Sequence, residues 1–234
     1  MKGERYMALV EVAELTKIYT ETHVPTTALK NVSVTVHQGE FAALVGPSGS
    51  GKTTLLNLIG GLDTPTGGSV FLDNINLSGL KEKFLARFRL MHVGFVFQSY
   101  NLIPVLTALE NVEYVMLLQG ISGSVRRQRA QQILEEVGIG DFSDRRPADM
   151  SGGQQQRVAI ARAIVSEPKL VLADEPTANL DSVTGRQLLE LMRNMNRKKN
   201  ITFIFSTHDP MVMDYARRII MLKDGIIVKD EVKS

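Results

Sequence analysis

The chain has 234 residues, enough for one α/β domain with a full hydrophobic core and an inserted subdomain. It contains no cysteine, which excludes zinc ribbons and thiol catalysis and fits a reducing compartment. The net charge is only +2, with acids and bases interspersed, so we expect no field of the kind that holds nucleic acid.

The apolar runs of the chain are a few residues long, far short of the ~20 that a membrane-spanning helix needs. The first residues carry too little apolar sequence for a secretory signal. We therefore expect a soluble, non-exported domain over residues 7–234, with residues 1–6 as a disordered extension. The basic clusters at residues 126–129 and 197–199 are expected to be solvated helix faces or ends.

Two segments near the start alternate between apolar and polar residues, namely residues 10–15 and 32–36. Strict alternation is typical of strands that are buried on one face, as in antiparallel sheets. The sequence therefore predicts an N-terminal antiparallel β subdomain.

A glycine-rich segment, GPSGSGKT at residues 46–53, follows the apolar run 41–45 and precedes a helical pattern over residues 53–62. Glycines let successive backbone N–H groups point inward, and the following helix adds its positive end, so this phosphate loop forms an anion cradle. Lys52 is expected to reach the β- and γ-phosphates of a nucleotide, and Thr53 to hold Mg²⁺. The alternative is an ordinary Gly/Ser-rich turn between a strand and a helix.

Residues 107–138 are mainly helical in pattern. Thr107 and Glu110 have the spacing of a capping box, the glycines at 120 and 123 interrupt the pattern, and Gly138 ends it. We expect this segment, within residues 99–150, to be an inserted helical subdomain.

The segment Ser151-Gly-Gly-Gln154 has capping-box spacing and should start a helix that runs through Val165. Each glycine costs such a helix ~1 kcal/mol relative to alanine, so a glycine pair in its first turn suggests close approach by another molecule. An anion at the bare backbone N–H groups is the natural candidate. The alternative is simply a capped helix.

Four short apolar runs, residues 41–45, 95–97, 170–173 and 201–205, read as parallel strands buried on both faces. The residues that follow them are Gly46, Gln98, Asp174 with Glu175, and the segment 206–208 ending in His208. Ligands of open α/β sheets bind beyond the carboxyl ends of the strands, so we expect these four tips to converge on one crevice.

Asp174 and Glu175 stand side by side at the end of an apolar strand, where unpaired charge is costly. They should face a cation and a solvent-filled cleft, with Asp174 anchoring Mg²⁺ and Glu175 acting on the attacking water. The alternative is that both acids cap the following turn.

Residues 219–228 are expected to form a hairpin about Asp224 and Gly225.

Taken together, these motifs resemble the nucleotide-binding subunit of an ATP-binding cassette (ABC) transporter, in the family's order and through nearly the whole chain. Beside the phosphate loop and the Asp174–Glu175 strand, Gln98 is similar to the Q-loop glutamine and residues 151–155 to the signature. Residues 178–181 are similar to the D-loop, and His208 to the switch histidine.

The resemblance implies an α/β fold with a P-loop NTPase (RecA-like) core, an N-terminal antiparallel β subdomain and an inserted α-helical subdomain. It implies an ATPase that uses ATP and Mg²⁺ and dimerises head-to-tail, so that the signature of one protomer covers the γ-phosphate held by Lys52 of the other. The implied catalytic residues are Glu175, His208, Gln98 and Lys52. The implied nucleotide-binding residues are Tyr19, Gly46, Ser48, Gly49, Ser50, Gly51, Lys52, Thr53, Thr54, Ser151, Gly153, Gln154 and Asp181. The implied metal ligands are Thr53, Gln98 and Asp174.

Three of these roles depend on the resemblance. The resemblance implies that Tyr19 stacks on adenine; without it, Tyr19 would be read as a core or edge-strand residue. Gln98 would be read as a strand-end amide with its hydrogen bonds satisfied. His208 would be read as a structural histidine. One departure is that Met150 precedes the signature where leucine is usual, and its similar volume predicts little effect.

Residues 94–112 are similar to the subfamily of lipoprotein release and of macrolide and peptide export. This similarity implies a separate integral membrane permease subunit and a peripheral position on the cytoplasmic face of the inner cell membrane. Phe97, Tyr100, Leu102 and Ile103 are expected to form the groove for that subunit, or else to pack the helical subdomain. The single cassette and the near-neutral charge disfavour a relative that acts on nucleic acid. Glu175 and His208 disfavour a nucleotide sensor that binds ATP without turnover.

Overall fold

Two β-sheets form the framework of the computed structural model, which describes residues 8–20 and 25–233. The extension expected over residues 1–6 lies outside the described residues. The strands are β1 (Ala8–Tyr19), β2 (Thr26–His37), β3 (Phe41–Val45), β4 (Gly67–Leu72), β5 (Ile75–Asn76), β6 (Val93–Val96), β7 (Leu170–Asp174), β8 (Thr202–Thr207), β9 (Arg218–Lys223) and β10 (Ile226–Val232). The helices are α1 (Lys52–Ile59), α2 (Glu82–His92), α3 (Ala108–Leu118), α4 (Gly123–Glu136), α5 (Gly152–Ile164), α6 (Ser182–Lys199) and α7 (Pro210–Tyr215), with two 3₁₀ turns at Gly140–Phe142 and Pro147–Asp149.

The larger sheet has the order β10-β9-β3-β8-β7-β6. β3, β6, β7, β8 and β9 run parallel, and β10 returns antiparallel to β9 through the predicted turn at Asp224 and Gly225. The parallel strands end at the same edge, so the tips of β3, β6, β7 and β8 meet there, as the sequence predicts.

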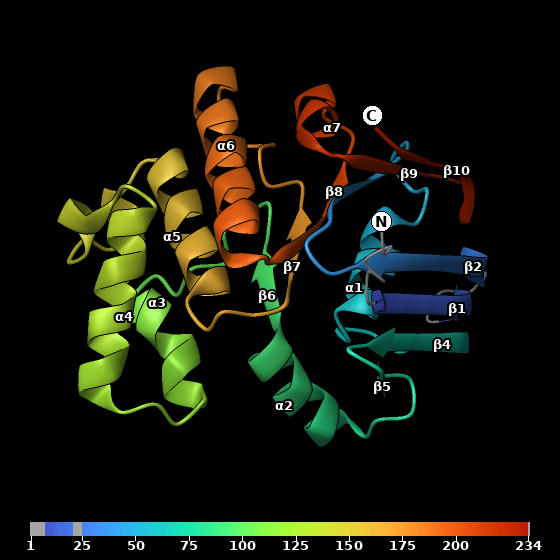
Figure 1. The fold of residues 1–234 in the computed structure, drawn as a ribbon, viewed down its shortest axis with the longest axis horizontal. Helices are drawn as coiled ribbons and strands as arrows, with labels where there is room; N and C mark the ends of the chain where they lie inside the picture. Colours follow the sequence, from blue (N-terminus) through green and yellow to red (C-terminus); the bar gives the residue numbers. More distant parts are fainter. Residues whose placement is uncertain (1–7, 21–24, 234) are drawn as a thin grey trace, which may run out of the picture.

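Both faces of β3, β7 and β8 are buried, which explains why these strands lack alternation. In β7, Val171 and Ala173 join the core packed by the helices α3 to α7, whereas Leu170 and Leu172 join the core on the other face. α1 and the second sheet cover that other face. In Figure 1 the large sheet therefore stands between the helices at the left and the small sheet at the right.

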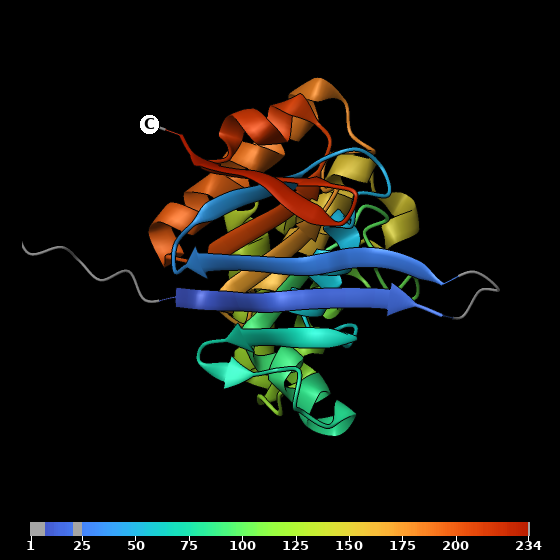
Figure 2. The ribbon, with the colours of Figure 1, turned by 90° about the vertical axis from the view of Figure 1, so that its right-hand side faces the viewer.

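The small sheet is antiparallel, with the order β2-β1-β4-β5. Its long strands β1 and β2 run side by side across the front of Figure 2. The N-terminal antiparallel subdomain is thus present, and β4 and β5 complete it from a later part of the chain.

The helical segment has the predicted form. Thr107 caps α3 through a full capping box with Glu110, and α4 begins at Gly123 after the break. Asn111 is fully buried, and its amide nitrogen donates to the carbonyls of Ile103, Leu106 and Thr107 while its Oδ1 accepts from the N–H of Ile103. The loop before α3 is therefore fastened to the helix. None of the helices in the described part of the chain is long and apolar enough to span a membrane.

Candidate functional site

The phosphate loop leaves β3 at Gly46 and enters α1 at Lys52. A Cβ at Gly46 would lie 2.1 Å from the carbonyl oxygen of Leu222, and one at Gly51 would lie 2.6 Å from that of Ala28. Both glycines have φ values in the left-handed half of the map, +152° and +101°. Glycine is needed at both positions because the loop is pressed against β9 and β2.

The turn of the β9–β10 hairpin also contacts the loop. The N–H of Gly225 donates to the carbonyl of Ser50 at 3.2 Å, and its own carbonyl accepts from the N–H of Lys30 at 2.8 Å. The β9–β10 hairpin thus supports the phosphate loop through the backbone of Gly225.

Lys52 is almost completely buried and its ammonium lies across the loop. Its Nζ donates to the carbonyls of Gly46 at 2.8 Å and Pro47 at 3.1 Å. Ser50 Oγ is buried with no hydrogen-bond partner among the described residues. Ser48 and Gly49 are exposed at the tip, and Thr54 follows in the first turn of α1. A phosphate would fit this site, because the glycine loop combines a buried cation, an unpaired hydroxyl and a helix N-terminus.

Asp174 at the end of β7 lies against the start of α1. The hydroxyl of Thr53 is 3.2 and 3.3 Å from the two carboxylate oxygens of Asp174. These are hard oxygen donors, the type that Mg²⁺ prefers. Among the described residues, no group of three or more His, Cys, Asp or Glu side chains is arranged to hold a metal ion by itself. This donor set fits Mg²⁺, which keeps several waters and phosphate oxygens as ligands.

Glu175 is held from the tip of β8. Its N–H donates to the carbonyl of Ser206 at 2.9 Å, and Thr207 Oγ1 donates to Glu175 Oε2 at 3.0 Å. His208 Nδ1 lies 2.6 Å from Oε1 of the same carboxylate. Glu175 has a φ of +45°, which is costly for a residue with a side chain. The carboxylate is therefore fixed at the crevice, while the His208 side chain is 68% exposed.

Gln98 follows β6, and its carbonyl accepts from Asn179 Nδ2 at 2.9 Å. Tyr100 and Asn101, just beyond it, both have positive φ, 62° and 49°. Arg162 of α5 donates to their carbonyls at 2.8 and 2.5 Å, and burial lowers the pKa of its guanidinium. The segment after Gln98 is thus bound to the helix that begins at the signature.

The signature segment, residues 151–154, forms the predicted capping box at the start of α5. Ser151 Oγ accepts from the N–H of Gln154, whose side chain accepts from the N–H of Ser151. A Cβ at Gly153 would lie 2.6 Å from Thr184 Cγ2, in α6. Asp181 caps α6, and the hydroxyl and N–H of Thr184 lower the pKa of its carboxyl. The signature therefore lies beside the D-loop of its own chain.

Tyr19 lies in β1, and its hydroxyl donates to Asp63 Oδ2 at 2.9 Å. Lys17 Nζ is 2.6 Å from the other oxygen of Asp63 and 4.7 Å from the centre of the Tyr19 ring. Burial alone would raise the pKa of Asp63, but the hydrogen bonds from Lys17, Tyr19 and the N–H of Thr64 leave it below its ordinary value. Sequence reasoning missed Lys17 and Asp63, although the position of Asp63 just after α1 and its glycine pair was visible.

The structure thus brings together the phosphate loop, Thr53, Asp174, Glu175 and His208. The signature and Asp181 form a second group with the segment after Gln98. Of the expected groove residues, Phe97 lines a cavity beside β6, whereas Leu102 packs against the core and the Tyr100 hydroxyl would be 2.8 Å from a Cβ at Gly152.

Comparisons with known proteins show which family the chain resembles. Residues 29–178 match the family described as ABC transporter. The chain is 48% identical to the lipoprotein-releasing system ATP-binding protein LolD of Anaeromyxobacter dehalogenans, over 94% of this chain and 93% of LolD. It is 47% identical to the macrolide export ATP-binding/permease protein MacB of Rhodopirellula baltica, over 86% of this chain but 30% of MacB. Among solved structures it resembles the dimeric, post-hydrolysis ATP-binding cassette MJ0796 of Methanocaldococcus jannaschii bound to ADP and Pi, with a TM-score of 0.89 and 44% identity over 96% of this chain and 99% of that one.

Proposed function

Since the chain belongs to the ABC transporter family and is an ATP-hydrolysing cassette, we propose that it works as a head-to-tail dimer, with Mg²⁺, and drives a separate membrane subunit. The observation that carries this proposal is the meeting of Lys52, Thr53, Asp174 and Glu175 at one edge of the sheet.

Each residue of this cluster has a separate task. Lys52 and the backbone N–H groups of the loop bind the phosphates, and burial of Lys52 strengthens its attraction for them. Thr53 and Asp174 would hold Mg²⁺, joined by Gln98. The metal, when bound, supplies charge that offsets the negative charge of the phosphates. Tyr19 is assigned to the adenine ring.

Glu175 acts on the water that attacks the γ-phosphate, as its base or by orienting it. Thr207 and His208 hold its two oxygens in place, so little reorganisation is needed during the reaction. In its other role, His208 contacts the γ-phosphate of the nucleotide on its own protomer.

The dimer supplies the second half of the site. The glycines in the first turn of α5 leave backbone N–H groups open to an anion, and in one chain they lie beside the D-loop. We assign Ser151, Gly153 and Gln154 to the γ-phosphate held by the partner, and Asp181 to the interface. The dimeric state of the cassette MJ0796 supports this assignment.

The membrane subunit is assigned to the cavity that Phe97 lines. The likeness to LolD and MacB supports export or lipoprotein release as the transport class. The cassette would then be a peripheral protein on the cytoplasmic face of the inner cell membrane.

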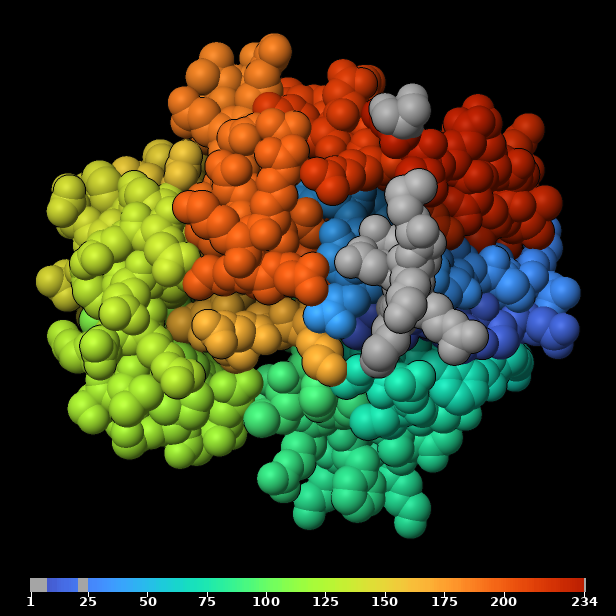
Figure 3. Space-filling view, in the orientation of Figure 1, coloured from blue at the N-terminus to red at the C-terminus, as the bar shows by residue number. Residues whose placement is uncertain are grey.

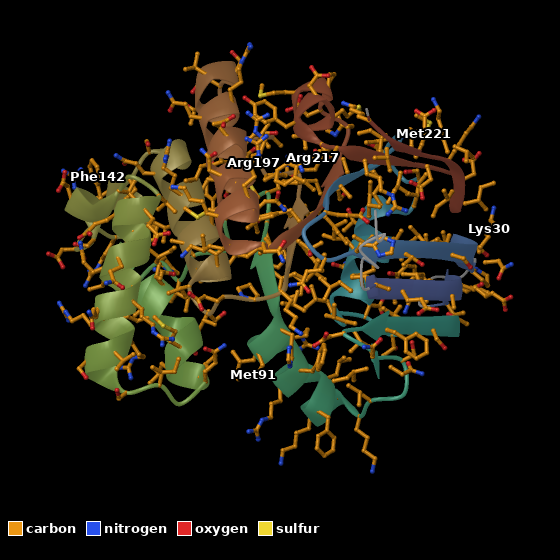
Figure 4. All side chains as sticks on the ribbon, in the orientation of Figure 1. Lys30, Met91, Phe142, Arg197, Arg217 and Met221 are labelled. Carbon is orange, nitrogen blue, oxygen red and sulfur yellow. The ribbon has the colours of Figure 1, made fainter. Side chains whose placement is uncertain are left out.

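The basic test compares wild-type chain with Lys52→Ala in calorimetric ATP titrations and in turnover assays with Mg²⁺ and with EDTA. We expect Mg²⁺-dependent turnover in the wild type and a marked loss of nucleotide affinity in Lys52→Ala. Lys30→Ala, an exposed lysine of β2 (Figure 4), should match the wild type. Unchanged affinity in Lys52→Ala would contradict the assigned role of the loop.

A further inference from the structure

Tyr19, the side chain assigned to the adenine ring, is held at its far end by a residue from another part of the chain. Its hydroxyl donates to Asp63 Oδ2 at 2.9 Å, across 44 positions of sequence. The second side-chain torsion of tyrosine has a broad range by itself. A hydrogen bond to a carboxylate is roughly twice as strong as one to a neutral acceptor, so this bond limits how the ring can turn.

Asp63 is itself held in place. Its Oδ1 accepts from Lys17 Nζ at 2.6 Å and from the N–H of Thr64 at 2.7 Å. Lys17 Nζ also donates to the carbonyl of Thr64 at 2.8 Å. Only 12% of the Lys17 side chain and 26% of the Asp63 side chain are exposed. The acceptor of the Tyr19 hydroxyl therefore has a fixed position.

Lys17 also contacts the aromatic ring directly. Its Nζ lies 4.7 Å from the centre of the Tyr19 ring, within the range of a cation–π interaction. An adenine ring is excluded from the face that this ammonium covers. Lys17 and Asp63 together thus restrict both the orientation of the ring and the side from which a base can approach it.

The backbone joins this anchor to the phosphate loop. The segment 63–66 is fastened along the end of β1, because the N–H of Thr66 donates to the carbonyl of Thr16 at 2.9 Å and its Oγ1 accepts from the N–H of Ile18 at 3.0 Å. In Figure 3 the blue atoms of β1 lie directly beside the turquoise atoms of β4, the strand that continues this segment. α1 begins at Lys52 and leads into the segment, so one helix connects the phosphate loop to the anchor of Tyr19.

We infer that Asp63 and Lys17 are positioning residues for base binding, which hold the Tyr19 ring in the orientation in which adenine stacks on it. They then raise the affinity for the base and leave the affinity for the phosphates unchanged. The inference rests on the proposed function, because it assigns the support of the side chain that is proposed to bind adenine. A purely structural role of the pair is an outcome of the test.

The probes are ADP and inorganic pyrophosphate, both with Mg²⁺, because they share two phosphates and only ADP carries a base. Calorimetric titration measures their affinities for wild type, Tyr19→Phe, Asp63→Ala, Lys17→Met and the double variant Tyr19→Phe/Asp63→Ala. The control is Glu136→Ala, which loses an ion pair of 3.1 Å with Lys199 between α4 and α6.

Tyr19→Phe keeps the ring and loses only the hydroxyl, so we expect it to bind ADP about three- to tenfold more weakly than wild type. Asp63→Ala and Lys17→Met should weaken ADP binding as well. The double variant should bind ADP no more weakly than Asp63→Ala, because phenylalanine has no second bond to lose. Pyrophosphate should bind equally well to all of these chains, and Glu136→Ala should match the wild type with both probes.

Unchanged ADP affinity in Tyr19→Phe, or an additive loss in the double variant, would overturn the inference. An equal loss of ADP and pyrophosphate would show a purely structural role and would also overturn it. Circular dichroism checks folding, and Tyr19→Phe with Lys17→Met decides the question if Asp63→Ala does not fold. Lys52→Ala is titrated alongside. Weaker binding of both probes there, with normal ADP binding in Tyr19→Phe, would leave the proposed function standing, whereas unchanged binding in Lys52→Ala would count against the proposed function itself.

Discussion

Glu175 stands at the end of β7, yet β8 sets its position. The chain order shows the acid and the apolar strand before it, so its presence at the strand tip could be predicted from the sequence. Its contacts with Ser206, Thr207 and His208 could not, because they depend on which strand lies beside β7 in the sheet.

Replacing Glu175 by Gln should preserve ATP binding and reduce turnover about 10²–10⁴-fold, because the amide cannot take a proton from water. ATP-bound dimers should accumulate and be visible by gel filtration. Glu11→Gln, at an exposed position of β1, is the control and should have normal turnover. Wild-type turnover in Glu175→Gln would remove the role assigned to this residue.

The role of Asp63 could not be predicted from residue patterns, because it accepts a hydrogen bond from Tyr19, which lies 44 positions away in the sequence. Its pKa is lower in the folded chain than its ordinary value of 3.8, so ionised Asp63 stabilises the fold. This contribution is complete above pH 3.8 and is lost as the pH falls through the lower, folded-state pKa.

Asp63→Asn should therefore unfold at a lower urea concentration than wild type at pH 7, and the difference should narrow below pH 3.8. Urea denaturation at pH 7 and at a pH below 3.8, followed by circular dichroism, measures this difference. A difference that stays constant on acidification would mean that the charge of Asp63 does not stabilise the fold.

At the scale of elements, the segments with one strong signal were predicted well. The buried strands β3, β7 and β8 and the capped starts of α3 and α5 are confirmed, and the likeness to solved cassettes confirms the fold class. The boundaries of the helical subdomain, residues 99–150, stay a prediction.

Three helices, α2, α6 and α7, were not predicted, and the first two were missed for different reasons. α6 carried a readable signal, since its buried positions include Leu188, Leu189, Met192 and Met195, spaced as one helix face, behind the N-cap Asp181. In α2 the exposed Phe84 and Met91 blur the apolar stripe. Met91 lines the cavity beside β6, whereas Phe84 does not.

Asn111 joins α3 to the loop before it, and this loop cannot fold in the same way without the four hydrogen bonds of the amide. Asn111→Ala should lower the free energy of unfolding by roughly 2–4 kcal/mol, because buried carbonyls would lose their donors. Urea denaturation measures this. Asn194→Ala, at an exposed position of α6, is the control for amide loss, and an equal effect of the two changes would contradict the argument.

At the scale of the whole molecule, each chain of the proposed dimer would carry two half-sites. The phosphate loop, Asp174 and Glu175 form one, and the signature with Asp181 forms the other. No pattern along a single chain can show which copy completes which half.

Mixing Lys52→Ala with Ser151→Ala chains tests the pairing. Half of the dimers formed are mixed, and a head-to-tail arrangement gives each mixed dimer one intact site, so about a quarter of wild-type turnover should return. In the control mixture, Lys52→Ala with Glu175→Gln, both changes affect the same half-site, so no intact site forms. Recovery in neither mixture, or in both, would count against head-to-tail pairing.

The contact between the C-terminal hairpin and the phosphate loop also has a consequence for how the protein is made. The loop is translated well before Leu222, which lies against Gly46, and Gly225, which bonds to Ser50. During synthesis, domains generally fold as units. Here the nascent chain would carry an unfinished nucleotide site until the β9–β10 hairpin has been made, so a chain that stalls before this hairpin would be unable to capture ATP.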